Sequence, residues 1–289
     1  PAEGFDLSVD TERAVDRIVS RMHGTYESWL GIAFPSPLVV HATMVESEAA
    51  YHAREPAVLG RSGHTSGYFV GATGEVVVWR GRGDATMRAT LVHETSHYLL
   101  ATAGLGRVPL WLQEGLAEVF ETATVDGNAV YLVPNGDALG WIRGRSVPKA
   151  SSLVGLDRQT WTALGATPWT RPEYPYGWAL CAFLLSSDPG RRTLSDVLLS
   201  TAVSSDPGAA AIDAIGRSWP GGVDTFDQAF AAYSPGRIQL PIRSSSGQAD
   251  GWAKCPDGSL IRPDLGAKCG GWVKGADGMS RWVEQRPVE

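Results

Sequence analysis

The residues with the clearest chemical potential lie in one short segment with two histidines and a glutamate. The segment His93-Glu94-Thr95-Ser96-His97 has the form His-Glu-x-x-His and lies in a stretch that is predicted to be a helix. With ~3.6 residues per helical turn, two side chains four positions apart lie on the same face, one turn apart. Two imidazoles placed in this way can bind one metal ion, and Glu94 can reach a water molecule beside that ion.

This pattern favours zinc-dependent hydrolysis of a peptide or protein substrate. Zinc lowers the pKa of a coordinated water from ~15.7 to ~7 and polarises a carbonyl group. A neighbouring carboxylate, here Glu94, takes up the released proton and can pass it to the leaving amine. Catalytic zinc keeps three protein ligands and leaves a fourth position open. The sequence therefore predicts one Zn²⁺ per chain and a third ligand outside the motif.

A second segment is suited to supply that third ligand. It reads Trp111-Leu112-Gln113-Glu114-Gly115-Leu116-Ala117 and follows Pro109, a residue typical of a first helical turn. Together the two segments resemble the gluzincin zinc peptidases, which include thermolysin-like, aminopeptidase-N-like and peptidase MA-like families. The resemblance implies that Glu114, 17 residues after His97, is the third ligand. It also implies that Glu118, one turn later, hydrogen-bonds a ligand imidazole.

A third segment, Tyr174-Pro175-Tyr176-Gly177, extends the resemblance. Aminopeptidase-like gluzincins carry a tyrosine three residues before a glycine that opens an apolar helix, and its hydroxyl stabilises the oxyanion. The spacing makes Tyr174 the counterpart, with Tyr176 as the alternative donor. The resemblance follows the order of elements over roughly residues 38–234.

The chain also departs from related patterns. A metzincin would carry glycine and histidine where this chain has Leu100 and Ala103. The Gly-x-Met-Glu-Asn segment of the aminopeptidases is absent from residues 71–79, which favours an endopeptidase. We expect that strand to pair with an extended peptide through its backbone. The alternative is a non-catalytic zincin-like domain that uses the metal for folding, or that binds through its cleft and through a Trp-rich tail that contacts a cell wall or another polymer.

Charge and hydropathy limit the partners. The formal net charge of the 289-residue chain is -6, and no lysine or arginine cluster stands out. A nucleic-acid partner needs a basic surface, so we expect none. The longest apolar run, residues 177–185, is far shorter than the ~20 residues of a membrane-spanning helix.

The predicted elements form an α+β fold with a small N-terminal mixed sheet, an active-site helix and a mostly helical C-terminal lobe. Periodicity predicts helices at 10–30, 84–103 and 110–122 and mostly helices at 138–234. Strands are predicted at 38–44, 68–70 and 75–79, with a loop at 51–66. A tight hairpin turn between short strands is predicted at 126–127. Asp84 is expected to be the N-cap of the metal-binding helix. The zincin-like catalytic domain is expected to span residues 1–243, with a sheet-bearing part at about 1–104 and a helical part at about 105–243.

Residues 244–289 are predicted to form a separate β-hairpin extension. The segment that begins Gly251-Trp252 is repeated 20 residues later from Gly271-Trp272, and each copy leads into an Asp-Gly turn. The repeated tryptophans resemble the aromatic hairpin repeats of some cell-wall-binding proteins, which implies wall binding by the tail. A structural cap that packs its tryptophans on the main domain is the alternative.

The three cysteines and the start of the sequence bear on the compartment. Cys181 is predicted to be a buried core residue. Cys255 and Cys269 either form a disulfide that ties down the tail or remain two free thiols. The sequence begins at Pro1 without an initiator methionine or a signal peptide. We expect a secreted chain whose signal has been removed, and a fragment of a longer protein is the alternative.

Overall fold

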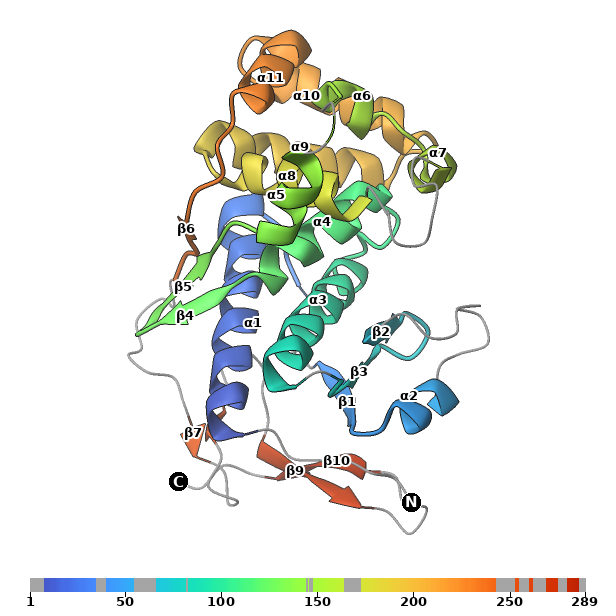
Figure 1. Ribbon diagram of the computed structural model, residues 1–289, viewed down its shortest axis with the longest axis vertical. Helices are drawn as coiled ribbons and strands as arrows, with labels where there is room; N and C mark the ends of the chain where they lie inside the picture. The colour runs from blue at the N-terminus through green and yellow to red at the C-terminus, as the bar shows by residue number, and fades with distance from the viewer. Residues whose placement is uncertain are drawn as a thin grey trace.

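The structure of the chain is a computed structural model (Figure 1). It describes residues 8–34, 40–54, 66–81, 83–143, 145, 148–163 and 173–242, and it describes strands at 253–254, 260–261, 269–274 and 280–285 as backbone. The described residues form the α+β structure that the sequence predicts.

Helix α1 (Val9–Leu30) is amphipathic and supports the centre of the molecule. Its buried stripe contains Ile18, Met22 and Tyr26, whose spacing of four residues places them on one helix face. The helix ends at Gly31, which adopts a left-handed conformation with φ 65°. The hydroxyl of Tyr26 lies 3.3 Å from Ser96 Oγ on α3 (Asp84–Thr102), the helix that is predicted to bind a metal, so α1 packs directly behind that helix.

A three-stranded mixed sheet lies beside the metal-binding helix (Figure 1). Its strands are β1 (His41–Val45), β3 (Glu75–Trp79) and β2 (Gly67–Val70), in that spatial order, with β1 parallel and β2 antiparallel to β3. Because successive strand residues point to opposite faces, Val77 packs toward α2 (Glu48–Arg54). Val76 and Val78 pack instead toward Met87 and Leu91 of the metal-binding helix. The central strand thus contributes to two hydrophobic clusters.

Two consecutive helices carry the predicted ligands. Helix α3 (Asp84–Thr102) contains the His-Glu-x-x-His motif, and α4 (Leu110–Glu121) contains Glu114. The connection is short, with Gly104 at φ 76° and a hydrogen bond of 2.7 Å from Leu105 N to Leu100 O. This tight turn folds α4 back against α3.

A pair of glycines allows α4 to contact α8 (Glu173–Leu185) backbone to backbone. A Cβ atom added at Gly115 would lie 2.3 Å from Gly177 O. A Cβ atom at Gly177 would lie 2.7 Å from Trp111 O. Only glycine fits at both positions, because real Cβ atoms do not approach other heavy atoms this closely. Helix α8 is apolar on all sides and is enclosed by its neighbours, which agrees with its composition.

The remaining elements complete the helical part around α8. The helices are α5 (Gly136–Arg143), α6 (Ala150–Val154), α7 (Arg158–Ala163), α9 (Asp188–Ala202), α10 (Pro207–Ser218) and α11 (Gly222–Ala231). In Figure 1, helices α8 to α11 gather at one end of the molecule. Across the described chain, every helix is too short or too polar to cross a bilayer.

A second three-stranded sheet contains the hairpin that the sequence predicts around residues 126–127, together with a third strand that the sequence does not predict. It contains β4 (Thr124–Asp126), β5 (Ala129–Leu132) and the short β6 (Ile238–Gln239), in that order. Arg17 and Arg21 of α1 donate hydrogen bonds to the carbonyls of the connecting turn at 2.6 and 2.8 Å. The strand β6 is too short and too far away in sequence to be detected from a local pattern.

The strands of residues 253–285 repeat with the same 20-residue spacing as the sequence. Strands β7 (Ala253–Lys254) and β8 (Leu260–Ile261) form one antiparallel hairpin, and β9 (Cys269–Lys274) and β10 (Ser280–Gln285) form another. Ala253 pairs with Ile261, and 20 residues later Val273 pairs with Arg281. The two hairpins therefore share one register. Cys255 lies outside the described residues and Cys269 is described only as backbone, so the disulfide stays a prediction.

Two local predictions differ from the structure. Residues 51–54, predicted as loop, end helix α2, whose start is capped by a hydrogen bond from Ala50 N to Ser47 Oγ. This short helix depends on burying Tyr51 against the sheet, a contact that no periodic pattern reveals. Asp84 is the first helical residue and not the N-cap. Its carboxylate accepts from Arg80 at 3.2 Å, and Gly83, at φ 117°, occupies the cap position.

The α4–α8 contact gives a prediction about stability. Replacing Gly115 with alanine is expected to destabilise the chain by about 1–3 kcal/mol, because the added methyl group overpacks the contact with Gly177. The measurement is urea unfolding followed by circular dichroism.

Gly140→Ala is the matched control, since a Cβ atom at this helical position meets nothing within 4 Å. We expect this variant to be unchanged or stabilised by about 0.4–1 kcal/mol. Equal stability of the two variants would contradict the proposed role of the glycine pair.

Candidate metal centre

The structure brings together the three predicted ligands, which lie on two helices. Nε2 of His93 lies 3.4 Å from Glu114 Oε2, and Nε2 of His97 lies 3.6 Å from the same oxygen. The two imidazole rings have centroids 5.0 Å apart and are inclined by 72°. One ligand atom from each of the three residues lies within 4.8 Å of the others. This cluster is a candidate site for one metal ion.

The spacing and chemistry of this cluster fit zinc. Tetrahedral zinc with bonds of ~2.1 Å places its ligand atoms roughly 3.4 Å apart, close to the two measured separations. Glu114 Oε2 is buried and has no hydrogen-bond partner among the described residues. A buried carboxylate oxygen without a partner is costly unless a cation neutralises it. Two imidazoles and a carboxylate are also a known ligand set of catalytic zinc.

Glu121, and not Glu118, accepts the hydrogen bond from the imidazole of His93. Nδ1 of His93 donates to Glu121 Oε2 at 2.9 Å, whereas Glu118 Oε1 lies 3.9 Å away, beyond hydrogen-bond distance. Because a carboxylate only accepts, this bond places a proton on Nδ1. The neutral ring then carries its lone pair on Nε2, the nitrogen that faces Glu114. Glu121 thus occupies the place that the resemblance assigned to Glu118.

The charges of the cluster depend on one another. Burial disfavours the ionised carboxylate of Glu114, but attraction to His97 and His93 outweighs burial and holds the pKa of Glu114 well below its ordinary value. Burial likewise disfavours the charged form of His93. Its contacts with Glu114 and Glu121 outweigh that effect and raise the pKa of His93 well above its ordinary value. The cluster is therefore strongly polarised and favours a positive charge between its members.

Glu118 is held by a residue from another element. Its Oε2 accepts a hydrogen bond of 3.2 Å from Nδ2 of Asn135, which lies just before α5. Burial, followed by repulsion from Glu121, raises the pKa of Glu118 to about 8. Of the two carboxyl groups beside His93, Glu121 is the one that accepts its hydrogen bond.

Glu94, the predicted base, faces the sheet. A Cβ atom added at Gly67, the first residue of β2, would lie 3.1 Å from Glu94 Cγ and 2.5 Å from Thr90 Cγ2. The glycine therefore lets β2 approach the helix directly beside the base. Burial raises the pKa of Glu94, while the charges of His93 and His97 oppose this shift. A raised pKa suits a group that must accept and release a proton.

The strand that is predicted to pair with a peptide is already paired with another strand on each side. Residues 75–79 form β3, which is hydrogen-bonded to β1 on one side and to β2 on the other. Such a central strand has no free edge. In the described part of the sheet, β1 and β2 lie at the two edges, and β2 is the edge strand whose first residue lies next to Glu94. The alternation of β-branched residues in 75–79 indicates a strand but gives no position in the sheet.

The structure distinguishes the two candidate tyrosines. The ring centroid of Tyr174, in the first turn of α8, lies 6.1 Å from that of His93. Tyr176 is only 5% exposed and packs edge-on against Trp141, with ring centroids 5.2 Å apart. Burial raises the pKa of Tyr176. Tyr174 is therefore the tyrosine beside the metal cluster, and Tyr176 is a packing residue.

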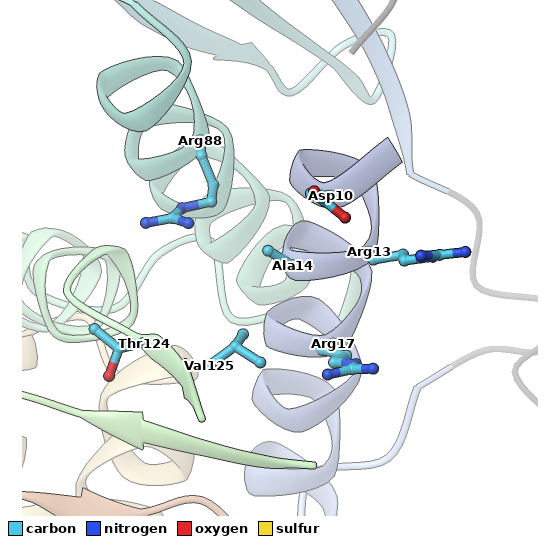
Figure 2. Close-up of a pocket in the computed structure, with 7 residues that line it drawn as sticks. All are labelled: Asp10, Arg13, Ala14, Arg17, Arg88, Thr124 and Val125. Atoms are coloured by element: carbon cyan, nitrogen blue, oxygen red, sulfur yellow. The ribbon is translucent and has the colours of Figure 1, made fainter. Parts of the chain in front are cut away.

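A surface pocket of about 560 Å³ lies apart from the metal cluster (Figure 2). Its lining comes from α1, α3 and β4 and consists of Asp10, Arg13, Ala14, Arg17, Arg88, Thr124 and Val125. In Figure 2 the guanidinium groups of Arg13 and Arg17 lie on the opposite side of α1 from Arg88. The positive groups do not converge on one point, so we assign no ligand to this pocket.

Comparison with known proteins adds a family match without a function. Residues 87–205 match a family described as "Protein of unknown function (DUF1570)". The matched segment is less than half of the chain, and it contains α4, most of α3, Asn135 and Tyr174. No curated protein matches the chain.

The contact between His93 and Glu121 gives a prediction about metal affinity. Replacing Glu121 with leucine is expected to weaken zinc binding by about 10–100-fold, because the imidazole loses the group that orients it. Zinc affinity is measured by competition with a chromogenic chelator.

Glu118→Leu is the matched control and is expected to change the affinity by less than ~3-fold, because Glu118 is beyond hydrogen-bond distance from His93. A larger loss in this control than in Glu121→Leu would restore Glu118 to the role that the resemblance gave it.

Proposed function

We propose that this chain is a zinc-dependent peptidase, and that it acts as an endopeptidase. The observation that carries the proposal is the cluster of His93, His97 and Glu114 around a buried carboxylate oxygen without a hydrogen-bond partner among the described residues. The two helices are held in place by α1 and α8, so the cluster is part of the packed interior and not a chance contact of surface side chains.

In this proposal, each residue of the centre has a separate task. His93, His97 and Glu114 would hold the zinc ion, which supplies a Lewis acid and makes a water molecule acidic. Glu94 accepts the proton of the attacking water and delivers it to the leaving amine. Tyr174 donates a hydrogen bond to the oxygen that becomes negatively charged in the tetrahedral intermediate. Glu121 keeps the His93 ring in the orientation that presents Nε2.

Among the described strands β2 has a neighbour on one side only, and this supports an extended peptide as the substrate. An edge strand offers backbone N–H and C=O groups with which a peptide can pair. Because Gly67 lies against Glu94, a peptide paired with this strand would pass close to the base. The absence of the aminopeptidase Gly-x-Met-Glu-Asn segment favours internal cleavage over removal of terminal residues. A zincin fold and export from the cell are parts of the same proposal.

The first functional prediction separates metal binding from catalysis. Glu94→Gln is expected to keep about one zinc per chain and to lose about 10²–10⁴-fold in the rate of peptide cleavage, because the base is missing. His97→Ala is expected to lose both zinc and activity. Zinc content is measured by elemental mass spectrometry, and cleavage by mass spectrometry of a mixed peptide library.

These two variants also test the alternative of a non-catalytic domain. A chain that binds zinc stoichiometrically but cleaves none of the peptides would favour that alternative. Full activity in Glu94→Gln would rule out Glu94 as the base.

The second functional prediction concerns the tyrosines of α8. Tyr174→Phe is expected to lower kcat by about 10²–10³-fold with little change in zinc content, because one oxyanion donor is removed. Tyr176→Phe is the matched control, since Tyr176 packs against Trp141, and it is expected to keep most of the activity. A loss confined to Tyr176→Phe would reverse the assignment.

A further inference from the structure

We propose that Asn135 is a positioning residue that determines which of two neighbouring carboxyl groups bonds to His93. The inference rests on the proposed metal centre, because His93 is one of its ligands. Asn135 lies outside every motif that the sequence analysis identified, in the connection between β5 and α5. It acts on His93 only through Glu118.

Two carboxyl groups compete for the same nitrogen. Glu118 and Glu121 are three residues apart on α4, so both lie on the face toward α3. One ligand atom each from His93, Glu118 and Glu121 lies within 4.8 Å of the others. A small rotation of the Glu118 side chain is enough to close its present 3.9 Å separation from Nδ1. The helix alone therefore does not determine which carboxyl group accepts the hydrogen bond from His93 Nδ1.

Asn135 removes this ambiguity because the oxygen and the nitrogen of its side-chain amide both form hydrogen bonds. Its Oδ1 accepts from Ala138 N at 3.0 Å, which caps the first turn of α5. Since an oxygen must face that backbone N–H group, the amide nitrogen is directed the other way. Nδ2 donates to Glu118 Oε2 at 3.2 Å. Asn135 thus holds Glu118 away from His93, and Nδ1 is left to Glu121 at 2.9 Å.

Loss of the amide nitrogen should release Glu118. The Glu118 side chain is only 14% exposed, and a buried carboxyl group without a donor is unfavourable. Nδ1 of His93 lies 3.9 Å from Glu118 Oε1 and is a donor within reach of a small side-chain rotation. We therefore expect Glu118 to bond to His93 once Asn135 no longer holds it, and so to replace Glu121 when that residue is absent.

The test is a double-mutant cycle of Asn135→Ser and Glu121→Leu, read by zinc affinity of the full chain. Serine retains the capping oxygen but lacks the donor that reaches Glu118. In the otherwise unchanged chain, Glu121→Leu is expected to weaken zinc binding by about 10–100-fold. In the Asn135→Ser background, the same change is expected to cost less than ~3-fold, because Glu118 takes over. Equal losses in both backgrounds would overturn the inference.

Two controls separate positioning from stability. Asn128→Ser makes the same substitution at an exposed asparagine of the β4–β5 turn, and it should leave the cost of Glu121→Leu unchanged. Urea unfolding of each variant without metal should show similar midpoints for Asn135→Ser and the starting chain, because the helix cap is retained. A residue that only capped α5 would alter unfolding but would not couple to Glu121.

A second measurement does not need zinc. The Nδ1–H resonance of His93 is followed by nitrogen-15 NMR in the metal-free chain. It should be protected from exchange in the starting chain, lost in Glu121→Leu, and restored in Asn135→Ser/Glu121→Leu. Absence of zinc binding by the starting chain would defeat the proposed function, whereas failure of the resonance to return would defeat the role of Asn135 alone.

Discussion

The close contact between Gly115 on α4 and Gly177 on α8 is the constraint on which the candidate metal centre depends. An added Cβ atom at Gly115 would lie 2.3 Å from the Gly177 carbonyl oxygen, so the two backbones touch. Gly115 follows the ligand Glu114 directly, and Gly177 lies three residues after Tyr174. The same contact that packs the helices therefore sets the distance between the third ligand and the tyrosine that faces His93.

The rest of the fold supports α3 and α4 from the other sides. Helix α1 contacts α3 through the pair Tyr26 and Ser96, and the small sheet packs against Met87 and Leu91. This enclosure keeps water away from Glu114, which explains why its charge is balanced by imidazoles and not by solvent. Burial also strengthens the electrostatic interactions among His93, Glu114 and Glu121, because the effective dielectric constant is low there.

The sheet has a part in the site as well as in the core. Gly67 allows β2 to lie against Glu94 without a side chain between them. The edge strand β2 and the predicted base are thus adjacent, although Gly67 and Glu94 are 27 positions apart in the sequence. The family match covers residues 87–205, so it contains α4 and most of α3 but not this strand.

Much of this protein can be predicted from local sequence. The spacing of His93 and His97 fixes their common helix face, and periodicity correctly predicts α1, α3 and α4. The hairpin of β2 and β3 is also predicted from its turn residues. These features depend on residues within a few positions of one another, so a single sequence contains the information that determines them.

The partner of His93 was decided by tertiary structure. Helical spacing offers Glu118 and Glu121 equally, and a resemblance to known peptidases selects Glu118, whereas the structure selects Glu121. The choice depends on how α4 is rotated against α3 and on a hydrogen bond from Asn135, which lies 17 residues beyond Glu118. The sequence by itself determined which residues can bind a metal and on which helices they lie. Only the packing of α4, α5 and α8 decided which side chains meet, because a difference of about 1 Å between two carboxylates depends on contacts between distant parts of the chain.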